Sequence, residues 1–537
     1  MKGAQAIVRC LEEENIKVVF GYPGATIVPL YEALRTSDIK HVLVRQEQAA
    51  AHSANGYARV SGTTGVCIGT SGPGATNLVT GIATAYMDSI PMVIITGQVN
   101  SAVIGRDVFQ EIDITGATEP FVKHSYLLKD AEQIPGTLRE AFHIAGTGRP
   151  GPVLVDVPVD IQKQDIDFHY PEKVVIRGYK PTYNGHAGQI TRIIRKLKSS
   201  RKPLVCAGGG ILSADAVCEL RLFAEKAGIP VVHTMMGIGA LAADHPLYLG
   251  MVGSHGHPCA NRAVSQSDLL VVIGARIGDR ATGGKEVFAE NAEIIHIDID
   301  PAEIGKNIKP IIPIVGDAKI IIRQLADKIQ PLETNGWLEQ LHTPQNKKHT
   351  APKSKKGTVN PAYAIQLLGS MVDDEAIVLA DVGQNQIWAA RNFELTGSRK
   401  FLTSGGLGTM GYSLPAAVGA KAGAAGKTVI SVVGDGGFQM SLGELGTISQ
   451  QNIKIFILLF NNNRLGMVRE IQDKTYSRTY GVDLDGNPDF LKLAEAYGFK
   501  GIRVACNDDL EAAFTEALNC HETFLVECMV DPEERTL

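Results

Sequence analysis

The sequence predicts an α/β protein of three doubly wound domains with mainly parallel sheets. Short apolar runs rich in Val and Ile alternate with Ala-rich stretches of helical character, and this alternation occurs in three separate blocks. Alternation of this kind is typical of parallel sheets covered by helices on both faces. The length of 537 residues agrees, because roughly 100–200 residues per domain gives about three domains.

Each block contains four or five apolar runs of strand length that are bounded by turn residues. Two polar, proline-bearing stretches, Tyr170–His186 and His342–Pro361, separate the blocks. We therefore expect domains at residues 1–170, 186–335 and 358–537. The expected strands are Lys17–Phe20, His41–Arg45, Thr64–Gly69, Pro91–Thr96 and Pro152–Val157 in the first block, Pro203–Ala207, Pro230–Thr234, Asp268–Gly274 and Glu293–Ile299 in the second, and Ala376–Asp381, Thr428–Val433, Lys454–Phe460 and Phe524–Val530 in the third.

The composition is that of an ordinary globular enzyme, with 44% hydrophobic and 20% charged residues. A net charge of −5 without a basic run gives no reason to expect nucleic acid or a membrane surface as partner. Apolar runs such as Ile90–Thr96 are too short to span a bilayer, and the charged N-terminal segment does not resemble a secretory signal. We expect a cytoplasmic protein, although an organelle protein whose transit peptide is removed would look the same.

Glycines cluster directly after several expected strands, where open α/β sheets bind their ligands. Glycine at such a turn also serves ordinary strand–helix connections, but five clusters in one chain favour a cofactor that carries phosphate. One further match, Gly406–Gly411, fits the dinucleotide pattern G-x-G-x-x-G. We reject it because no expected strand directly precedes it and no acidic residue occurs roughly 20 positions further on. The five clusters are Gly21–Gly24, Gly72–Gly74, Gly208–Gly210, Gly405–Gly406 and Gly434–Gly437.

The most informative motif is Gly434–Gly437, followed by Asn462 at 27 positions after Asp435. Asp435 ends one apolar strand and Asn462 ends the next, so neighbouring parallel strands would place both side chains at one sheet edge. Carboxylate and amide oxygens are ligands that suit Mg²⁺, and Mg²⁺ in turn shares its shell with a diphosphate. The alternative is a pair of ordinary turns, which the strand context disfavours.

G-D-G followed by N-N at this spacing resembles the thiamine-diphosphate motif, and the resemblance extends over nearly the whole chain. Taken together, the matching segments resemble the large catalytic subunit of acetolactate synthase (acetohydroxyacid synthase). These segments are FGYPGATIVPLYEAL, RQEQAAAHSANGYARVSG, GTSGPGATNLVTGIATAYMDSIPMVIITGQ, GRPGPVLVDVP, GARIGDRATG, HIDIDPAEIGK, TSGGLGTMGYSLPAA and LGMVRE.

The resemblance implies an N-terminal pyrimidine-binding domain, a central FAD-binding-like domain and a C-terminal diphosphate- and Mg²⁺-binding domain. It assigns catalytic roles to Glu47 beside the pyrimidine, to Gln110 and Lys123 facing thiazolium and substrate, and to Arg280 at the acceptor carboxylate. The residues implied to bind thiamine diphosphate are Gly24, Pro73, Asn77, Gly383, Gln384, Gly408, Met410, Gly434, Asp435, Gly436, Gly437 and Met467, the Mg²⁺ ligands are Asp435, Asn462 and the carbonyl of Arg464, and the FAD contacts are Arg149, Gly208, Gly209, Gly210, Met251, His255, Gly274, Arg276, Asp298 and Asp317.

The implied reaction decarboxylates pyruvate and transfers the hydroxyethyl carbanion to pyruvate or 2-oxobutanoate, in branched-chain amino acid biosynthesis. The overall reaction is not redox, so FAD would be structural. Each site in the family is shared between two subunits, which implies a homodimer or tetramer, and a regulatory small subunit is a further partner to expect. The alternatives are a related thiamine-diphosphate decarboxylase or oxidase, a catabolic acetolactate synthase, or a non-catalytic flavin- or nucleotide-binding regulator.

Three positions depart from the family pattern. Asn385 replaces the usual histidine after Gly383-Gln384, Ala25 replaces a glycine, and Ile471 stands where most members have tryptophan. The last change predicts a weaker preference for 2-oxobutanoate over pyruvate as the acceptor, because the two differ by a single methylene.

Overall fold

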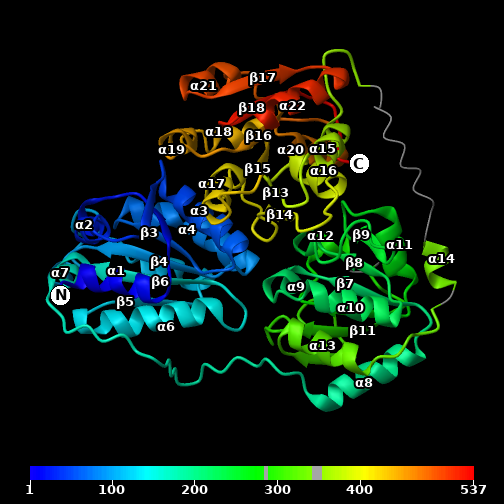
Figure 1. Cartoon of the computed structure of the whole chain (residues 1–537), viewed down its shortest axis with the longest axis horizontal. Coiled ribbons are helices and arrows are strands. Elements are labelled where there is room, and N and C mark those ends of the chain that lie inside the picture. Colours follow the sequence, from blue (N-terminus) through cyan, green and yellow to red (C-terminus); the bar gives the residue numbers. More distant parts are fainter. Residues whose placement is uncertain (284–287, 335, 342–353) are drawn as a thin grey trace.

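The computed structural model describes residues 1–283, 288–334, 336–341 and 354–537. Within these residues the chain forms three α/β lobes, each built on one six-stranded sheet (Figure 1). All pairings between the named strands are parallel, which confirms the predicted fold class. Residues 342–353 of the expected linker His342–Pro361 lie outside the described residues.

The first lobe, blue to cyan in Figure 1, has the strand order β2-β1-β3-β4-β6-β5. Its strands are almost fully buried in the middle of the sheet, because helices cover both faces. The elements are β1 (Val18–Gly21), β2 (Lys40–Leu43), β3 (Gly65–Gly69), β4 (Met92–Gln98), β5 (His124–Leu127) and β6 (Pro152–Pro158), with helices α1 (Gly3–Glu13), α2 (Val28–Leu34), α3 (Glu47–Ser61), α4 (Pro73–Asp88), α5 (Ile114–Thr118), α6 (Ile134–Gly146) and α7 (Val159–Lys163).

The second lobe, green in Figure 1, has the order β12-β11-β10-β7-β8-β9. Two apolar layers, one on each face of this sheet, form its core. The elements are β7 (Pro203–Ala207), β8 (Val231–His233), β9 (Tyr248–Met251), β10 (Leu269–Ile273), β11 (Glu293–Asp298) and β12 (Ile312–Val315), with helices α8 (Ala187–Ser199), α9 (Gly209–Ser213), α10 (Val217–Ala227), α11 (Pro258–Gln266), α12 (Asp279–Thr282), α13 (Ala318–Lys328) and α14 (Trp337–Leu341).

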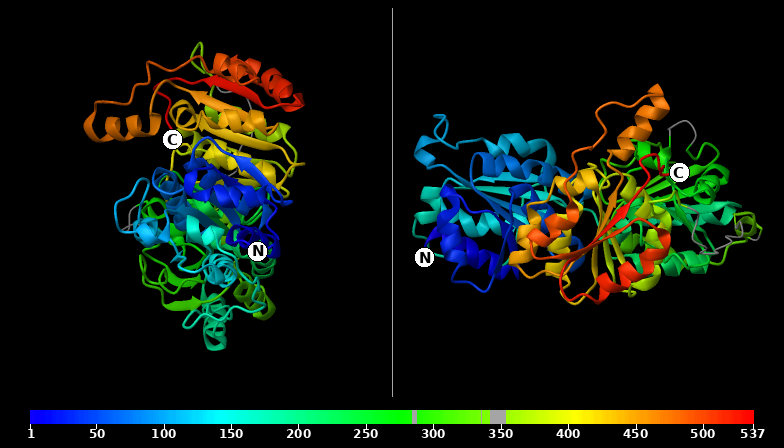
Figure 2. Two further views of the ribbon diagram at one scale, coloured as in Figure 1. Left: turned by 90° about the vertical axis from the view of Figure 1, so that its left-hand side faces the viewer. Right: turned by 90° about the horizontal axis from the view of Figure 1, so that it is seen from above.

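The third lobe, yellow to red, has the order β14-β13-β15-β16-β18-β17. Helix α20 stands away from its body in both views of Figure 2, and only Gly466 and Arg469 of this helix are buried. The elements are β13 (Ile377–Ala380), β14 (Lys400–Thr403), β15 (Val429–Gly434), β16 (Phe456–Asn461), β17 (Lys500–Val504) and β18 (Phe524–Met529), with helices α15 (Pro361–Met371), α16 (Gln384–Asn392), α17 (Ser413–Gly423), α18 (Asp435–Gln439), α19 (Glu444–Gln450), α20 (Gly466–Tyr476), α21 (Phe490–Ala496) and α22 (Leu510–Asn519).

All the expected strands are present, and their ends fall within two residues of the expected bounds. The sequence analysis missed five further strands, β5, β9, β12, β14 and β17, and each of these lies at the edge of its sheet. β5, β12 and β17 are partly exposed, and β9 and β14 are only four residues long, so none of the five shows the continuous apolar run by which the inner strands were found. β14 also corrects one argument above, because it ends just before the Gly405–Gly411 loop, where no preceding strand was expected.

Helices α3 and α17 join the first and third lobes. A Cβ on Gly56 of α3 would come within 2.1 Å of the Ala416 carbonyl oxygen, and a Cβ on Gly419 of α17 within 1.8 Å of the Ser53 carbonyl oxygen. The two helices therefore approach through reciprocal glycines, and no larger residue fits at either contact. Across the described residues, none of the helices combines the length and apolar character that a bilayer span requires.

Candidate active site

The carboxyl ends of β13, β14, β15 and β16 carry the loops of the expected diphosphate site. β15 and β16 are parallel neighbours in register, with Gly434 opposite Phe460. Asp435 and Asn462 follow these strands directly, so they lie at one edge of the sheet as their spacing predicts. Both side chains are buried.

Asp435 and Asn462 present oxygen atoms in a hydrogen-bonded setting. Asp435 Oδ2 accepts a 2.7 Å hydrogen bond from Asn487 Nδ2, and burial raises the pKa of Asp435 to about 6. Asn462 Oδ1 accepts from the backbone N–H of Arg464 at 3.0 Å, while its Nδ2 donates to Gln384 Oε1 at 2.9 Å. One carboxylate, one amide oxygen and a nearby backbone carbonyl are a donor set that fits Mg²⁺. The sequence analysis missed Asn487, because nothing in its local sequence marks it.

Two glycines keep the space above these loops open. Gly383 precedes α16 with a φ of +144°, which favours glycine, and a Cβ there would lie 2.8 Å from Asn385 Oδ1. The same oxygen would lie 3.2 Å from a Cβ on Gly434. Asn385 Nδ2 donates to the Asp381 carbonyl at 2.7 Å and to the Val432 carbonyl at 3.4 Å, so the residue that replaces the family histidine links the β13–α16 loop to β15. Side-chain-free backbone at adjoining strand ends fits a diphosphate.

Met410 lies beside the same loops. Its Cε would be 3.6 Å from a Cβ placed on Gly436, which puts the expected cofactor prop next to the G-D-G-G turn. The loop that carries Gly408 is tied to the first lobe, because Thr409 Oγ1 lies 2.8 Å from Thr84 Oγ1 of α4.

The first lobe gathers the other half of the expected thiamine site. Glu47 begins α3, is buried, and accepts a 2.9 Å hydrogen bond from Asn77 of α4. Its Oε1 would lie 3.2 Å from a Cβ on Gly74, and a Cβ on Gly24 would lie only 2.4 Å from Thr70 Cγ2. Pro73, the first residue of α4, shares this edge of the sheet.

Gln110 lies over the start of α4. Its backbone has a φ of +60°, and its Cα would be 2.9 Å from a Cβ on Gly72. The structure therefore brings Gln110 to the edge where Glu47 and Asn77 lie. The neighbouring Phe109 is almost fully exposed, which leaves this segment facing outward.

Glu47 and the Gly408 loop contact different turns of α4. Glu47 contacts α4 at Asn77, and the Gly408 loop contacts it at Thr84, through Thr409. Seven residues of α-helix separate these contacts by about 10 Å, at 1.5 Å per residue.

Lys123 lies apart from both sets of loops. Its ammonium donates to the carbonyl oxygens of Ile144 and Thr147, the latter at 2.7 Å, and to Tyr179 Oη at 3.0 Å. Burial lowers the pKa of Lys123 to about 8. In this arrangement the lysine fastens Tyr179, in the segment between the first two lobes, to the end of α6.

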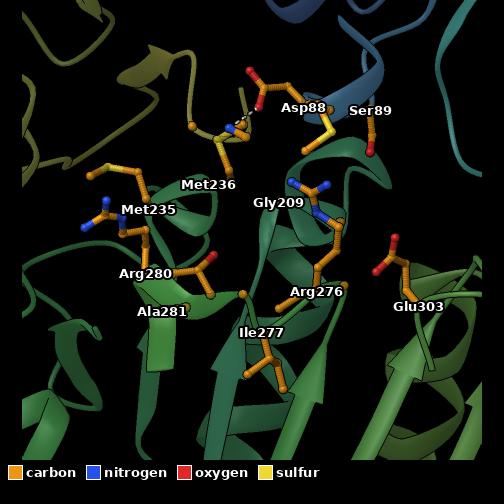
Figure 3. Close-up of a pocket in the computed structure, with 18 of the residues that line it drawn as sticks. Asp88, Ser89, Gly209, Met235, Met236, Arg276, Ile277, Arg280, Ala281 and Glu303 are labelled. Carbon is orange, nitrogen blue, oxygen red and sulfur yellow. Dashed lines mark hydrogen bonds between the residues drawn. The ribbon is translucent and has the colours of Figure 1, made fainter. Parts of the chain in front are cut away.

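A cavity of about 760 Å³ opens where the three lobes meet (Figure 3). Among the residues expected to contact FAD, only Gly208 does not line it, and Gly208 packs against the Gly274 carbonyl nearby. Arg280 of the second lobe also lines the cavity, and residues of the third lobe form part of its wall. The expected flavin residues along it are Arg149, Gly209, Gly210, Met251, His255, Gly274, Arg276, Asp298 and Asp317, and the third lobe contributes Gly383, Gly408, Met467 and Ile471.

One arginine of this cavity, Arg276, is placed to bind an anionic group. Arg149 is neutralised by Asp300 at 3.1 Å and Glu303 at 2.8 Å. Arg276 has no hydrogen bond or ion pair to its guanidinium from any described residue, and burial lowers its pKa. Figure 3 shows its guanidinium directed into the open space. An arginine held without a partner inside a cavity is suited to phosphate, so the cavity fits the diphosphate of FAD.

Asp88 is a cavity residue that the sequence analysis did not single out. It ends α4, is buried, and its Oδ1 accepts a 2.7 Å hydrogen bond from the N–H of Gly406, drawn as a dashed line in Figure 3. Burial raises its pKa to about 6. Asp88 thus fastens the Gly405–Gly408 loop to the first lobe, a contact that no local sequence signal reveals.

Comparison with known proteins agrees with this geometry. Three family models match the chain, described as thiamine pyrophosphate enzyme N-terminal TPP binding domain (residues 1–117), central domain (190–325) and C-terminal TPP binding domain (381–528). The chain is 48% identical to the probable acetolactate synthase large subunit of Methanocaldococcus jannaschii, over 99% of this chain and 93% of that protein. It is 47% identical to the acetolactate synthase large subunit of Corynebacterium glutamicum, over 96% and 84%. The chain therefore belongs to the acetolactate synthase large-subunit family of thiamine pyrophosphate enzymes.

Proposed function

We propose that this chain decarboxylates pyruvate and transfers the resulting two-carbon unit to a second 2-oxo acid, either pyruvate or 2-oxobutanoate. The observation that carries the proposal is that a chain matching the acetolactate synthases along its length keeps Glu47 buried and Asp435 and Asn462 together. This combination argues against a non-catalytic regulator, which would need none of the three. The biosynthesis of branched-chain amino acids is the pathway that we propose for it.

Thiamine diphosphate supplies the nucleophilic carbon and the electron sink that decarboxylation of a 2-oxo acid requires. Around it, Glu47 would hold a proton at the pyrimidine ring nitrogen, and Asn77 keeps the carboxyl in place. The Gly408 carbonyl would accept a hydrogen bond from the exocyclic amino group, and Met410 would support the bend between the rings. Gln110 would face the substrate from the first lobe.

Mg²⁺ would join the diphosphate to the third lobe. Asp435 and Asn462 would be its side-chain ligands and the Arg464 carbonyl its backbone ligand. The glycines of the Gly383 and Gly434–Gly437 turns would let backbone N–H groups reach the phosphate oxygens.

FAD would occupy the cavity between the lobes. The unpaired Arg276 supports this assignment, together with the glycine loops of Gly209–Gly210 and Gly274. Because the net reaction transfers no electrons, we propose a structural role for the flavin. Arg280, exposed at the cavity wall, would bind the carboxylate of the acceptor through its guanidinium.

We propose that two copies of the chain share each site, as a homodimer or a tetramer of such pairs. The separation of Glu47 from the Gly408 loop supports this, because within one chain the two contact α4 at positions about 10 Å apart. The relatives are named large subunits, which supports a regulatory small subunit as partner. The buried free cysteines Cys67, Cys206 and Cys528 support a cytoplasmic location, because thiols stay reduced there.

Incubation of the purified chain with pyruvate, thiamine diphosphate and Mg²⁺ tests the proposal. 2-Acetolactate yields acetoin only after acidification, so we expect a colour test for acetoin to be weak before acid and strong after it. A chain whose buried Glu47 is changed to Gln serves as the blank. Acetaldehyde or acetate as the main product, with no rise of acetoin on acidification, would identify a decarboxylase or oxidase instead.

A further inference from the structure

The segment Glu533–Thr536 lies across α16 and α20, directly beside the diphosphate loops. The Glu534 carbonyl accepts hydrogen bonds from Gln384 Nε2 at 2.8 Å and from Arg469 Nη2 at 2.6 Å. Thr536 donates its backbone N–H to Glu470 at 2.9 Å and its hydroxyl to the other carboxylate oxygen at 3.0 Å. The segment is therefore held by Gln384, Arg469 and Glu470, which lie on the helices that follow the expected diphosphate and Mg²⁺ loops.

Gln384 is the point where the segment touches the metal site. Its Nε2 donates to the Glu534 carbonyl and to the Glu470 carboxylate, and both are acceptors only. Its Oε1 must then face the other way, where it accepts from Asn462 Nδ2 at 2.9 Å. The amide has little room to turn, because Gly466 packs so closely that a Cβ there would be 1.9 Å from Oε1.

The orientation of Gln384 decides which end of the Asn462 amide faces a cation. With Gln384 presenting its oxygen, Asn462 must present Nδ2 to it and direct Oδ1 to the opposite side. If the Gln384 amide turned over, Nε2 would face Asn462, and the favoured Asn462 orientation would place an amide NH₂ at the cation. An NH₂ group cannot ligate Mg²⁺.

We propose that the segment Glu533–Thr536 is a positioning element for the Mg²⁺ site, which orients the Asn462 oxygen through Gln384. Glu534 acts with its backbone carbonyl, and Thr536 acts by holding Glu470. The inference rests on the proposed Mg²⁺ site. It assigns Glu534 and Thr536 a role at that site although neither would contact the cation directly.

Arg469 of α20 is a second anchor of this segment. Its side chain is 1% exposed and donates to the Glu534 carbonyl. It also approaches Glu533 at 3.4 Å, so the segment supplies a carboxylate to a buried cation on α20. The same helix carries Met467 and Ile471 into the cavity between the lobes. The segment thereby couples the base of α20 to the metal loops.

The test compares the full chain with a variant that ends at Glu533, which lacks the Glu534 carbonyl and Thr536. Calorimetric titration of Mg²⁺ at saturating thiamine diphosphate should show an affinity about 10–100-fold lower, as for the loss of outer-shell partners of metal ligands. At saturating Mg²⁺, kcat and the pyruvate KM should return to near those of the full chain, because the cation itself then selects the Asn462 oxygen. Arg535→Ala is the matched control, since it removes only the exposed pair with Asp473 and should leave Mg²⁺ affinity unchanged.

A pair of point variants covers the outcome in which the shortened chain does not fold. Thr536→Val loses the hydroxyl donor to Glu470, and Thr536→Ser keeps it. We expect weaker Mg²⁺ binding in the first and recovery in the second, with equal melting temperatures. Unchanged Mg²⁺ affinity in both the shortened chain and Thr536→Val would overturn the inference. A full chain that binds the cofactor without any divalent cation would instead overturn the proposed metal site.

Discussion

Asn77 donates a 2.9 Å hydrogen bond to Glu47, and this contact joins the first turns of α3 and α4 at the carboxyl edge of the first sheet. It holds one carboxylate oxygen, while the other lies next to Gly74, where glycine leaves space. The arrangement is that of a carboxyl held in a fixed orientation toward a ligand above the sheet edge.

Glu47→Gln should reduce acetolactate formation by at least about 100-fold, the usual range for loss of a positioned proton-transfer group. Glutamine keeps the shape and a hydrogen bond to Asn77, but it cannot hold or release a proton at the pyrimidine. Glu444→Gln is the matched control, a buried carboxyl that contacts the Arg45 backbone N–H instead. Turnover of Glu47→Gln near that of the parent, at saturating cofactor, would refute the assignment.

Asp435→Ala should weaken Mg²⁺-dependent binding of thiamine diphosphate by at least about 100-fold. Loss of a direct ligand should exceed the 10–100-fold effect of outer-shell changes, because Mg²⁺ tolerates an incomplete octahedron poorly. Titration calorimetry measures the affinity, with the exposed Asp485→Ala as control. Equal cofactor affinity in the two variants would count against Asp435 as the ligand.

Mg²⁺ affinity should also fall as the pH falls through about 6. Burial raises the pKa of Asp435 from 3.8 to about 6, so below that pH a proton occupies the carboxyl and Mg²⁺ must displace it. The apparent affinity should then drop by up to tenfold per pH unit. The same raised pKa means that this carboxyl destabilises the cofactor-free fold as the pH rises from about 4 to 6. Titrations at several pH values test this, and a flat profile between pH 5 and 7 would contradict it.

The purified protein should carry FAD and be yellow, and Arg276→Ala should bind it about 10–100-fold more weakly. Loss of a charged hydrogen bond to phosphate is worth roughly 1.5–3 kcal/mol. Flavin absorbance after gel filtration provides the measurement, with Arg201→Ala as an exposed control. A colourless and fully active parent protein would place this chain among flavin-free synthases.

Ile471 should make the enzyme less selective for 2-oxobutanoate than family members with tryptophan. It is half exposed on α20 and lines the cavity beside Met467 and Arg280. Discrimination of one methylene is worth about 1–3 kcal/mol even in a good pocket, and isoleucine offers less surface than an indole. A competition assay with both acceptors should show a higher preference for 2-oxobutanoate in Ile471→Trp. A strong preference already in the parent, unchanged in the variant, would assign selectivity to another residue such as Arg280.

Herbicides that stack on the family tryptophan provide a second readout of the same position. Isoleucine has no aromatic face, so the parent should bind them weakly and Ile471→Trp should bind them more tightly. Inhibition curves for the two proteins measure the difference. Equal and strong inhibition of both would show that stacking at residue 471 does not govern binding.

The missed strands show where sequence reasoning reaches its limit in the fold. Inner strands such as β10 and β16 are buried on both faces, and their continuous apolar runs are visible without any structure. β17 contains Lys500 and Arg503 and is largely exposed, so its sequence looks like a loop. Its identity as a strand depends on pairing with β18, which only the assembled sheet provides.

By itself, the sequence determined the three parallel sheets and the adjacency of Asp435 and Asn462, because both depend on local periodicity and on the ends of successive strands. Only the tertiary structure decided that the three lobes share one cavity, that Glu47 and the Gly408 loop contact different turns of α4, and that Lys123 is bound to backbone oxygens. It also decided that Glu534 reaches Gln384, 150 positions away along the chain. Such contacts depend on how whole lobes pack, and packing between distant segments leaves no periodic signal in the residues that meet.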